Sequence, residues 1–596
     1  MSALDWIIVV AYFLASAALG LYFANRAGRS IEEFFLSGRN LPWWLAGTSM
    51  VATTFAADTP LAVTELVARN GVAGNWLWWN FAFGGVLTVF FFARLWRRAG
   101  VLTDVELVER RYSGRPAAFL RGFRAVYLGV FMNGVIMAWV NLAMATILEG
   151  MFGIPRGRVF LYVALAMVVT ALYSALSGLW GVAVTDAFQF VLAMIGTTVL
   201  AVVILDLPEI GGIAGLRERL PPWTFLMTPV IGRGLGIADG AGVLALSLSG
   251  FLAYVGVQWW ASWYPGAEPG GGGYVAQRIM SAKDERHSVF ATLWFTIAHY
   301  CIRPWPWILV GLASLVLYPE LGPDQKRLGY VFAMRDHLPS GLRGLLVASF
   351  FAAYMSTVAT QLNWGTSYVI NDLYKRFLRP LAQERELVRL SRLTTLLVMG
   401  LSLVITLHLN TIKGAWEFVI EASAGLGLVL ILRWYWWRVN AWSEIVAMVA
   451  ALAGYAGVRL GTDLKFPDTL YPTVAFTTVA WLAATFATRP VEWSTLVEFF
   501  RTVRPGGLGW RPIARVCRDV RPDSGLFRLF VDWLAGVVLV YSALFAVGNY
   551  LLGDRDVALL LAGLVVVSGA WVWWDLARKP RGGPQTASSS RFQARS

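Results

Sequence analysis

Polar residues that could bind a cation interrupt an otherwise apolar run at residues 43–66. Its middle carries Thr53, Thr54, Asp58, Thr59 and Pro60. Proline removes a backbone donor and frees the carbonyl of the preceding turn, and a carboxylate inside a membrane is costly unless it faces a cavity or a partner. Carbonyl, hydroxyl and carboxylate oxygens are the ligands that hard cations prefer. The pattern predicts a broken helix that lines an ion or substrate site, with an ordinary proline kink as the alternative.

A second set of small and hydroxyl side chains shares one helical face in the run at 341–371. Its members are Ala352, Ala353, Ser356, Thr357 and Thr360. Small residues alone are typical of close helix packing. A serine and a threonine opposite an unwound helix, however, form an oxygen-rich site of low charge that suits sodium. The residues alone leave both interpretations open.

The sequence offers little for other chemistry. Its two cysteines, Cys301 and Cys517, lie far apart, and its four histidines are not spaced as metal ligands. It contains no phosphate-binding or zinc-protease signature and no evident pair of nucleophile and base. We therefore expect no enzyme activity and no cofactor, and energy for any transport would come from an ion gradient.

The composition places these residues in a membrane protein. Of the 596 residues, 57% are hydrophobic and 14% are charged, against about 45–50% and about 25% in soluble domains. Fifteen long apolar runs are too long for the strands of a membrane barrel. The predicted fold class is therefore an all-α polytopic membrane protein with about 15 transmembrane helices. The runs are 4–24, 43–66, 73–95, 121–148, 159–177, 182–205, 242–264, 288–318, 341–371, 394–410, 415–437, 441–460, 469–488, 529–550 and 556–576.

The positive charges predict the orientation. If fifteen runs alternate from an outside N-terminus, the cytoplasmic loops carry 35 Lys and Arg, the outside loops carry 14, and Arg303 lies within a run. Such an excess of cations is typical of the cytoplasmic side. We predict an outside N-terminus, a cytoplasmic C-terminus and a location in a plasma membrane of bacterial type. The net charge of +14 thus reflects mostly the cations of the predicted cytoplasmic loops and does not indicate nucleic-acid binding.

The spacing of the runs predicts an internal repeat. The second to sixth and the seventh to eleventh runs form two groups of five, and each group begins with an interrupted run. This layout is typical of an inverted repeat, in which two broken helices form a site near the membrane midplane. The predicted parts are a peripheral helix at 1–30, a transport core at 31–440 with repeats at 43–205 and 242–437, two helices at 441–488, a basic connector at 489–528, two helices at 529–576 and a disordered tail at 577–596.

Four stretches resemble the sodium:solute symporter family. They are EEFFLSGRNLPWWLAGTSMVAT at 32–53, LYSALSGLWGVAVTDAFQ at 172–189, YVAQRIMSAKDE at 274–285, and AAYMSTVATQLN at 352–363 with NDLYKRF at 371–377. The resemblance implies the five-plus-five inverted repeat of the leucine-transporter type, with extra peripheral helices. A Pro/Gly-rich insertion at 264–273 departs from the family pattern, and we interpret it as a flexible hinge.

The resemblance also implies a sodium site. Its ligands would be the backbone carbonyls of Ala52, Phe55 and Ala353 and the hydroxyls of Ser356 and Thr357. Asp186 matches a family aspartate beside this site. It would offset the charge of the ion through an intervening water, or it would merely cap a short helix after Gly181.

Candidate substrate contacts are polar or aromatic residues near the interrupted runs. They are Asp58, Thr59, Gln258, Trp259, Trp263 and Arg303. Tryptophan could stack on a sugar or cover an ammonium group. Arg303 is a cation within an apolar run, so it is a candidate for carboxylate binding or for a structural ion pair with Asp58, Glu417 or Glu421.

The sequence therefore predicts a sodium-coupled symporter of a small organic solute, an amino acid or a sugar, that works by alternating access. Its expected partners are the solute, sodium and the lipid bilayer, with no obligate protein partner. The alternative is a transporter-like sensor that binds a solute and signals to a partner without transport.

Overall fold

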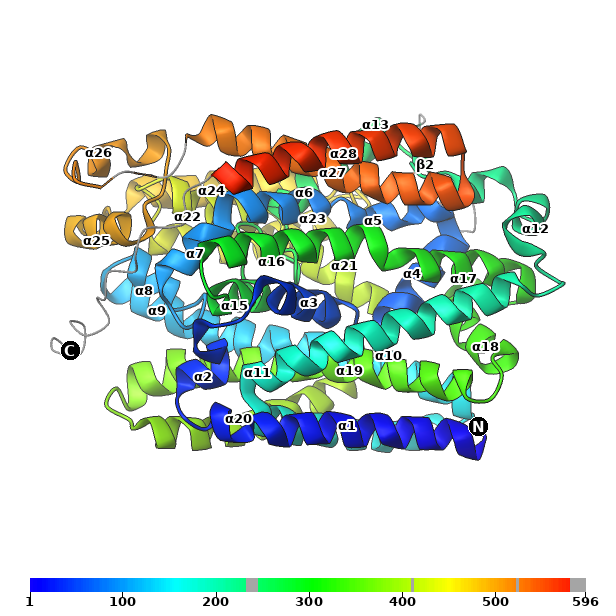
Figure 1. The fold of residues 1–596 in the computed structure, drawn as a ribbon. Helices are drawn as coiled ribbons and strands as arrows, with labels where there is room; N and C mark the ends of the chain where they lie inside the picture. The colour runs from blue at the N-terminus through cyan, green and yellow to red at the C-terminus, as the bar shows by residue number, and fades with distance from the viewer. Residues whose placement is uncertain (232–244, 409–411, 521, 523–524, 579–596) are drawn as a thin grey trace.

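Long helices lie side by side along a common direction and form a bundle (Figure 1). The structure is a computed structural model that describes residues 1–231, 245–408, 412–520, 522 and 525–578. Within these residues, eleven helices are long and apolar enough to cross a membrane, and a pair bent by 57° makes a possible twelfth span. The predicted helical membrane fold is confirmed, whereas the predicted count of about 15 spans is not.

The first predicted repeat begins with two short helices where the sequence predicts a broken one. Helix α3 (Trp43–Thr54) ends before the break, and α4 (Asp58–Asn70) begins after it. Pro60 falls in the first turn of α4, where its missing N–H leaves no helical hydrogen bond unmade. The remaining elements of this half are η2 (Val72–Asn75), α5 (Trp76–Trp79), α6 (Ala82–Leu87), η3 (Thr88–Phe92), α7 (Ala93–Ala99), α8 (Leu107–Arg111), α9 (Gly114–Val126), η4 (Tyr127–Met132), α10 (Asn133–Phe152) and α11 (Arg156–Leu205).

Helix α11 folds back on itself and contains two of the predicted runs. Gly178 has φ 57° and ψ −167°, outside the helical region. The Tyr173 hydroxyl lies 2.6 Å from the Thr185 hydroxyl twelve residues later, whereas a straight helix would separate them by about 18 Å. The two arms are therefore antiparallel. This fold-back explains part of the difference between the predicted and the observed number of spans.

The second half follows the same plan. It begins with α13 (Leu248–Ala253), η6 (Tyr254–Gln258) and α14 (Trp259–Ala261), which an irregular segment separates from α15 (Gly273–Ser281). A π-helical turn interrupts the next span at η7, as η3 does in the first half. The later elements are α16 (Glu285–Ile297), η7 (Ala298–Ile302), α17 (Pro304–Leu317), η8 (Pro323–Gln325), α18 (Leu328–His337), α19 (Leu342–Ser367), η9 (Tyr368–Leu378), α20 (Glu384–Thr406), α21 (Ile412–Ala422) and α22 (Leu426–Tyr435).

Other elements surround these two halves. A two-stranded parallel pair, in which Val230 and Ile231 face Ala245 and Leu246, is an addition to the predicted all-helical fold. The peripheral elements are α1 (Ala3–Ala27), α2 (Ile31–Leu36), η1 (Ser37–Arg39), α12 (Gly212–Arg219), η5 (Pro222–Phe225), β1 (Val230–Ile231), β2 (Ala245–Leu246), α23 (Ala441–Gly461), α24 (Leu470–Ala487), α25 (Trp493–Val503), η10 (Leu508–Trp510), α26 (Arg511–Ala514), α27 (Leu526–Leu552) and α28 (Arg555–Arg578). The predicted disordered tail lies almost wholly outside the described residues.

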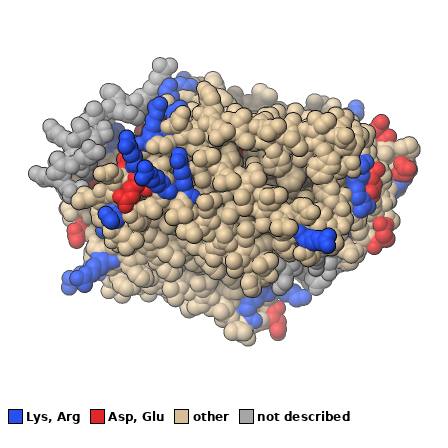
Figure 2. Space-filling view, turned by 90° about the horizontal axis from the view of Figure 1, so that it is seen from below, with Lys and Arg blue, Asp and Glu red and all other residues tan. Residues whose placement is uncertain are grey.

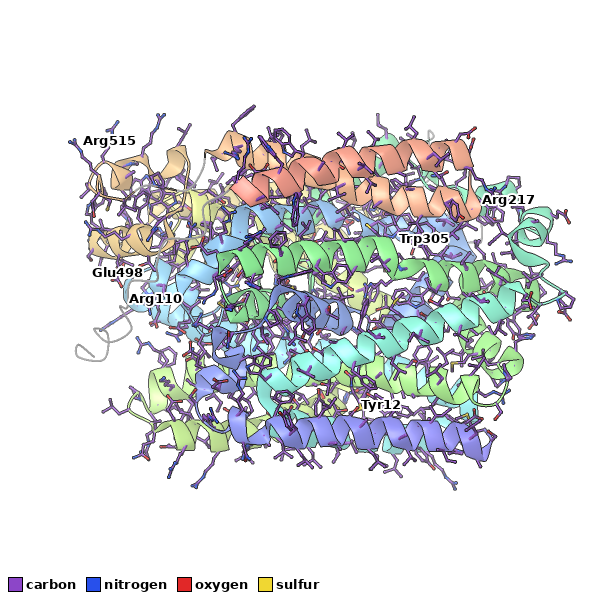
Figure 3. The ribbon with its side chains drawn as sticks, viewed as in Figure 1. Tyr12, Arg110, Arg217, Trp305, Glu498 and Arg515 are labelled. Atoms are coloured by element: carbon purple, nitrogen blue, oxygen red, sulfur yellow. The ribbon has the colours of Figure 1, made fainter. Side chains whose placement is uncertain are left out.

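Charged residues mark the two ends of the bundle. Figure 2 shows most of the Lys, Arg, Asp and Glu of one face at its ends, with an almost uncharged band between them. Arg110, Glu498 and Arg515 lie at one end and Arg217 at the other (Figure 3). Helix α1 begins at the end opposite to that at which α28 finishes (Figure 1). An odd number of membrane crossings gives this arrangement.

The end that holds α8 and α9 has a network of charges. Glu109 accepts hydrogen bonds from Arg121 at 2.7 Å and from Arg376 at 2.8 Å. Partial burial raises the pKa of Glu109, but the hydrogen bonds and charges of Arg376 and Arg121 outweigh burial and hold this pKa below its ordinary value of 4.5. The ionised carboxylate therefore stabilises this end of the fold.

We expect acid to remove this stabilisation. A lowered carboxyl pKa contributes stability above the ordinary value, and the contribution is lost as the pH falls below about 4.5. Thermal unfolding of the purified protein should therefore show less acid destabilisation in Glu109→Gln than in the wild type, with a difference of about 1 kcal/mol or less because the pair is partly exposed. Glu498→Gln, at an exposed pair 3.8 Å long, is the control. Equal acid sensitivity of Glu109→Gln and the wild type would contradict the expectation.

Candidate functional site

The break between α3 and α4 leaves backbone carbonyls that other elements must satisfy. The Thr53 carbonyl accepts a hydrogen bond from the Thr357 hydroxyl of α19 at 2.8 Å. The Thr54 carbonyl accepts from the Arg303 guanidinium and, at 3.2 Å, from the Thr59 hydroxyl. The end of a helix carries unpaired carbonyls and partial negative charge, so a guanidinium is well placed there. The broken helix is thus held by side chains from the second half of the chain.

The serine and threonine of α19 meet an aspartate of α11. The Ser356 hydroxyl donates to Asp186 at 2.6 Å, and the Ser49 hydroxyl of α3 donates to the other oxygen of Asp186 at 2.5 Å. All three side chains are buried. Asp186 therefore accepts hydrogen bonds from two helices rather than capping its own helix. The alternative role for Asp186, the cap of a short helix after Gly181, is wrong because α11 continues through Gly181.

Two of the carbonyls predicted as sodium ligands accept hydrogen bonds within their own helices. The Ala353 carbonyl accepts from the Thr357 hydroxyl at 3.1 Å. The Ala52 carbonyl accepts from the N–H of Phe55, the residue that caps α3. Each hydroxyl donates one proton and keeps lone pairs for a cation. The structure thus brings the C-terminal end of α3 and the middle of α19 together. Both carry carbonyl or hydroxyl oxygens, the type of ligand that sodium prefers.

A guanidinium occupies the other side of Asp186. Arg278 of α15 lies 3.7 Å from Asp186, and both side chains are fully buried. Arg278 also donates to the Ser49 hydroxyl at 3.1 Å and to the Thr360 hydroxyl at 2.6 Å. Arg278 thus joins both broken helices to α11 and α19. It lies in one of the four stretches that resemble the family, but it was not among the predicted site residues.

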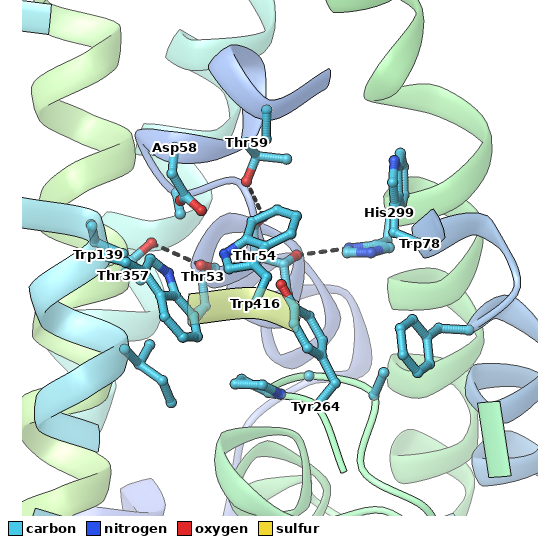
Figure 4. A pocket seen from close by; sticks show the side chains of 18 of the residues that line it. Thr53, Thr54, Asp58, Thr59, Trp78, Trp139, Tyr264, His299, Thr357 and Trp416 are labelled. Carbon is cyan, nitrogen blue, oxygen red and sulfur yellow. Dashed lines mark hydrogen bonds between the residues drawn. The ribbon is translucent and has the colours of Figure 1, made fainter. Parts of the chain in front are cut away.

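A cavity opens beside the break in α3 and α4 (Figure 4). It contains about 760 Å³ of space between protein atoms, including the part open to solvent. Three of the predicted substrate residues line it, namely Asp58, Thr59 and Arg303. Thr357 lines it as well, so the cavity adjoins the candidate sodium site.

Aromatic rings and buried polar atoms form the walls of this cavity. Its aromatic lining residues are Trp78, Phe81, Trp139, Tyr264, Tyr274, His299, Tyr300 and Trp416. Three lining atoms make no hydrogen bond within the described structure, namely an Asp58 carboxylate oxygen, the Gln361 side-chain oxygen and the Trp416 indole N–H. Since buried polar atoms are normally paired, two acceptors and one donor are available here to a bound solute.

Arg303 is a structural cation of the cavity wall. Besides the Thr54 carbonyl, its guanidinium contacts the His299 ring nitrogen at 3.1 Å. Because arginine only donates, that nitrogen must accept, which leaves the other ring nitrogen protonated to donate to the Thr54 hydroxyl at 2.9 Å. Of the ion pairs considered for Arg303, the one with Asp58 does not form within the described structure, and Glu421 pairs with Arg459 instead.

The other three predicted substrate residues lie outside this cavity. The Gln258 side chain donates to the Leu77 carbonyl at 3.1 Å. Trp259 packs against Phe83 and Trp533. Trp263 lies in a separate pocket beside α22 and α23. The irregular segment after α14 reaches the cavity only from Tyr264 to Ala267, so the residues that precede Tyr264 are directed elsewhere.

Several residues that line the cavity were not predicted from the sequence. His299 precedes Arg303 by four residues on one helical face, and this spacing could have identified it. Trp139, Trp416 and Gln361 carry no comparable signal, because tryptophan and glutamine in an apolar helix serve equally well as packing residues. Only the fold shows that they meet at one cavity.

Two halves with broken first helices around a central cavity define the leucine-transporter type of membrane transporter. The chain has this fold in common with the structure of a sodium-coupled sialic acid symporter in a substrate-bound outward-open state. The TM-score is 0.67, and the match has 18% identity and covers 82% of this chain and 99% of that one. The five-plus-five inverted repeat with peripheral helices is therefore confirmed.

The chain belongs to the sodium:solute symporter family, whose model matches residues 34–454. It is 26% identical to the sodium/glucose cotransporter 4 of Danio rerio over 76% of this chain and 71% of that protein. It is 25% identical to the sodium/glucose cotransporter of Vibrio parahaemolyticus over 80% and 89%. The chain is thus a multi-pass, sodium-coupled transporter and not an enzyme. These findings give no support to the alternative of a sensor.

Proposed function

We propose that the protein imports a small organic solute, a sugar or an amino acid, together with sodium by alternating access. The observation that carries this proposal is the cavity at the break of α3 and α4, which Thr357 lines and where three polar atoms make no hydrogen bond to the described residues. Sodium would bind between α3 and α19 and stabilise the broken helix, after which the solute would complete the cavity. No cofactor or obligate protein partner is part of this proposal.

We favour a solute rich in hydroxyl groups. Asp58 and Gln361 offer acceptors to hydroxyl donors, and Trp139 and Trp416 offer apolar faces on which a sugar ring can stack. The Arg303 guanidinium, which would hold the carboxylate of an amino acid, is already engaged with Thr54 and His299. The names of the relatives above, two sodium/glucose cotransporters, agree with this preference.

We also propose that the basic end of the bundle, at α8 and α9, faces the cytoplasm of a bacterial cell. The N-terminus would then lie outside and the C-terminus inside. An inward sodium gradient and an inside-negative potential would both drive uptake in this orientation, the potential by about 2.3 kcal/mol per charge and 100 mV.

Transport by the purified protein in liposomes tests the function. A thermal-shift screen of sugars, amino acids and carboxylates, each with sodium or potassium, first identifies a ligand. That ligand, radiolabelled, should accumulate in proteoliposomes with an inward sodium gradient and fail to accumulate with potassium. Binding of the ligand without sodium-driven accumulation would contradict the proposal. Stabilisation by amino acids but not by sugars would overturn the preferred solute class.

Replacing Asp58 by asparagine should weaken the binding of the solute. Asp58 is buried, and one of its oxygens is unpaired in the cavity. A hydrogen bond to a charged group contributes about 1.5–3 kcal/mol, so the Kd of the solute should rise by about 10-fold to 100-fold. Stabilisation of the protein by sodium alone should persist.

Asp336→Asn is the matched control for this prediction. Asp336 pairs with Arg335 at 2.7 Å and is partly exposed, and it does not line the cavity. Its replacement should leave the affinity for the solute unchanged. If Asp58→Asn binds the solute as the wild type does, Asp58 is not a substrate contact.

A further inference from the structure

The irregular segment at 262–272 forms one wall of the cavity. Tyr264, Pro265, Gly266 and Ala267 line the cavity, and the residues after them turn away from it. The Gly270 carbonyl accepts from the Trp96 indole at 2.9 Å. Gly271 has φ 72°, and a Cβ there would lie 2.8 Å from the same indole nitrogen. Glycine is therefore required where the segment packs against α7, and the segment is built into the interior.

One residue of this segment is a buried acid without a partner. Glu268 is 4% exposed, and neither of its carboxylate oxygens makes a hydrogen bond to any residue that the structure describes. The backbone N–H groups of Gly266 and of Glu268 itself lie close enough to favour the carboxylate, but neither meets the geometry of a hydrogen bond. A carboxylate in such a place would lose its hydration without compensation.

A second acid lies beside it, and this one is well supplied with donors. Asp104, in the loop between α7 and α8, accepts from the Tyr368 hydroxyl and, at 3.1 Å, from the Gly273 N–H. The glycines at 272 and 273 lie against both acids. A Cβ on Gly273 would lie 2.5 Å from a Glu268 oxygen, and a Cβ on Gly272 would lie 3.6 Å from an Asp104 oxygen. Within the described residues, Asp104 is thus hydrogen-bonded, whereas Glu268 is not.

Among the described residues, no cation acts on Glu268. Tyr274 of α15 and Asp104 are the titratable groups that face it. The nearby Arg433 of α22 lies over the Trp96 ring and pairs with Glu444. Like charges held close together disfavour a second ionisation. Burial, which has the largest effect, and the nearby Asp104 both favour the protonated form of Glu268, and they outweigh the opposing effect of the two backbone N–H groups.

We propose that Glu268 is a proton-binding site beneath the solute cavity, and that it holds its proton while this wall of the cavity is closed. Beyond it lies the network of charges at the α8–α9 end. Thr103, next to Asp104, donates to Asp372 at 2.6 Å, and Asp372 pairs with Arg121. Opening of the cavity toward this end would separate Glu268 from Asp104 and admit water. The carboxylic acid then ionises to a carboxylate and releases its proton to that water.

Infrared difference spectroscopy of the purified protein tests the protonation directly. At pH 7 the wild type should show the carbonyl band of a protonated carboxylic acid, which shifts in heavy water, and Glu268→Gln should lack that band. Glu109→Gln, which removes an arginine-bound carboxylate, should retain it. Absence of the band in the wild type, or its persistence in Glu268→Gln and in Glu268→Ala, would overturn the proposal.

A second readout uses thermal unfolding. A carboxyl group that keeps its proton in the folded state, but ionises in the unfolded chain above about pH 4.3, makes the fold less stable as the pH rises. The Tm of the wild type should therefore fall relative to that of Glu268→Gln between about pH 5 and about pH 8. Parallel pH profiles of the two proteins would contradict the proposal. Neither readout requires transport, so failure of the proposed function would leave this test intact.

Discussion

Replacing Ser356 and Thr357 together by alanine is expected to abolish the sodium dependence of solute uptake. The two hydroxyls lie between the end of α3, which the Thr357 hydroxyl contacts at the Thr53 carbonyl, and Asp186 of α11, to which Ser356 donates. Alanine removes both side-chain oxygens and leaves the helix intact, since alanine is the best helix former. Loss of groups that merely support a ligand costs about 10-fold to 100-fold in metal affinity, so loss of two ligands should cost at least as much.

The measurement is uptake into proteoliposomes against the external sodium concentration, together with the sodium-induced shift in Tm. Both should vanish in the double variant, while the protein still inserts and elutes as a single species. Ser349→Ala is the matched control, because Ser349 is a buried serine of the same helix whose hydroxyl donates to the Leu345 carbonyl. A double variant that responds to sodium like the wild type would remove α19 from the ion site.

Replacing Arg278 by methionine should produce the largest loss of stability. Arg278 and Asp186 are both fully buried, and removal of one partner of a buried ion pair leaves an uncompensated charge that costs about 3–5 kcal/mol. Methionine keeps much of the length of the side chain. The fall in Tm in detergent, followed by the fluorescence of the many tryptophans, measures the effect.

The double variant Arg278→Met with Asp186→Asn separates charge from packing. Removal of both charges should recover part of the lost stability, because the asparagine can still accept from Ser49 and Ser356. Arg335→Met is the control, since the Arg335–Asp336 pair is well exposed and such pairs contribute about 0–1 kcal/mol. If Arg278→Met is no less stable than Arg335→Met, the buried pair has no structural role.

The sequence predicted the parts of the fold that follow from local chemistry. Pro60 amid hydroxyl residues predicted the break between α3 and α4, and the small and hydroxyl residues at 352–360 predicted the face of α19 that meets that break. The grouping of apolar runs into two sets of five also predicted the repeat. Each of these signals lies within one continuous stretch of chain, where period and propensity are informative.

Features that depend on distant segments could not be predicted in the same way. Gln258, Trp259 and Trp263 belong to the correct broken helix, but packing against Leu77, Trp533 and the α22 region directs them away from the cavity. The segment at 264–273, interpreted as a hinge, is packed against α7 and α22 through its glycines. Trp139 and Gln361 reach the cavity from helices whose relative positions no local pattern specifies.

The shared carboxylate of Asp186 links two events at distant helices in thermodynamic terms. One of its oxygens accepts from Ser356 at the candidate sodium site, and the other faces Arg278 on α15. A sodium ion at that site would draw on the same negative charge as the guanidinium, so its arrival would weaken the anchoring of α15. Coupling free energies are reciprocal. Any movement of α15 that loosens Arg278 must therefore tighten the hold of Asp186 on sodium by the same factor.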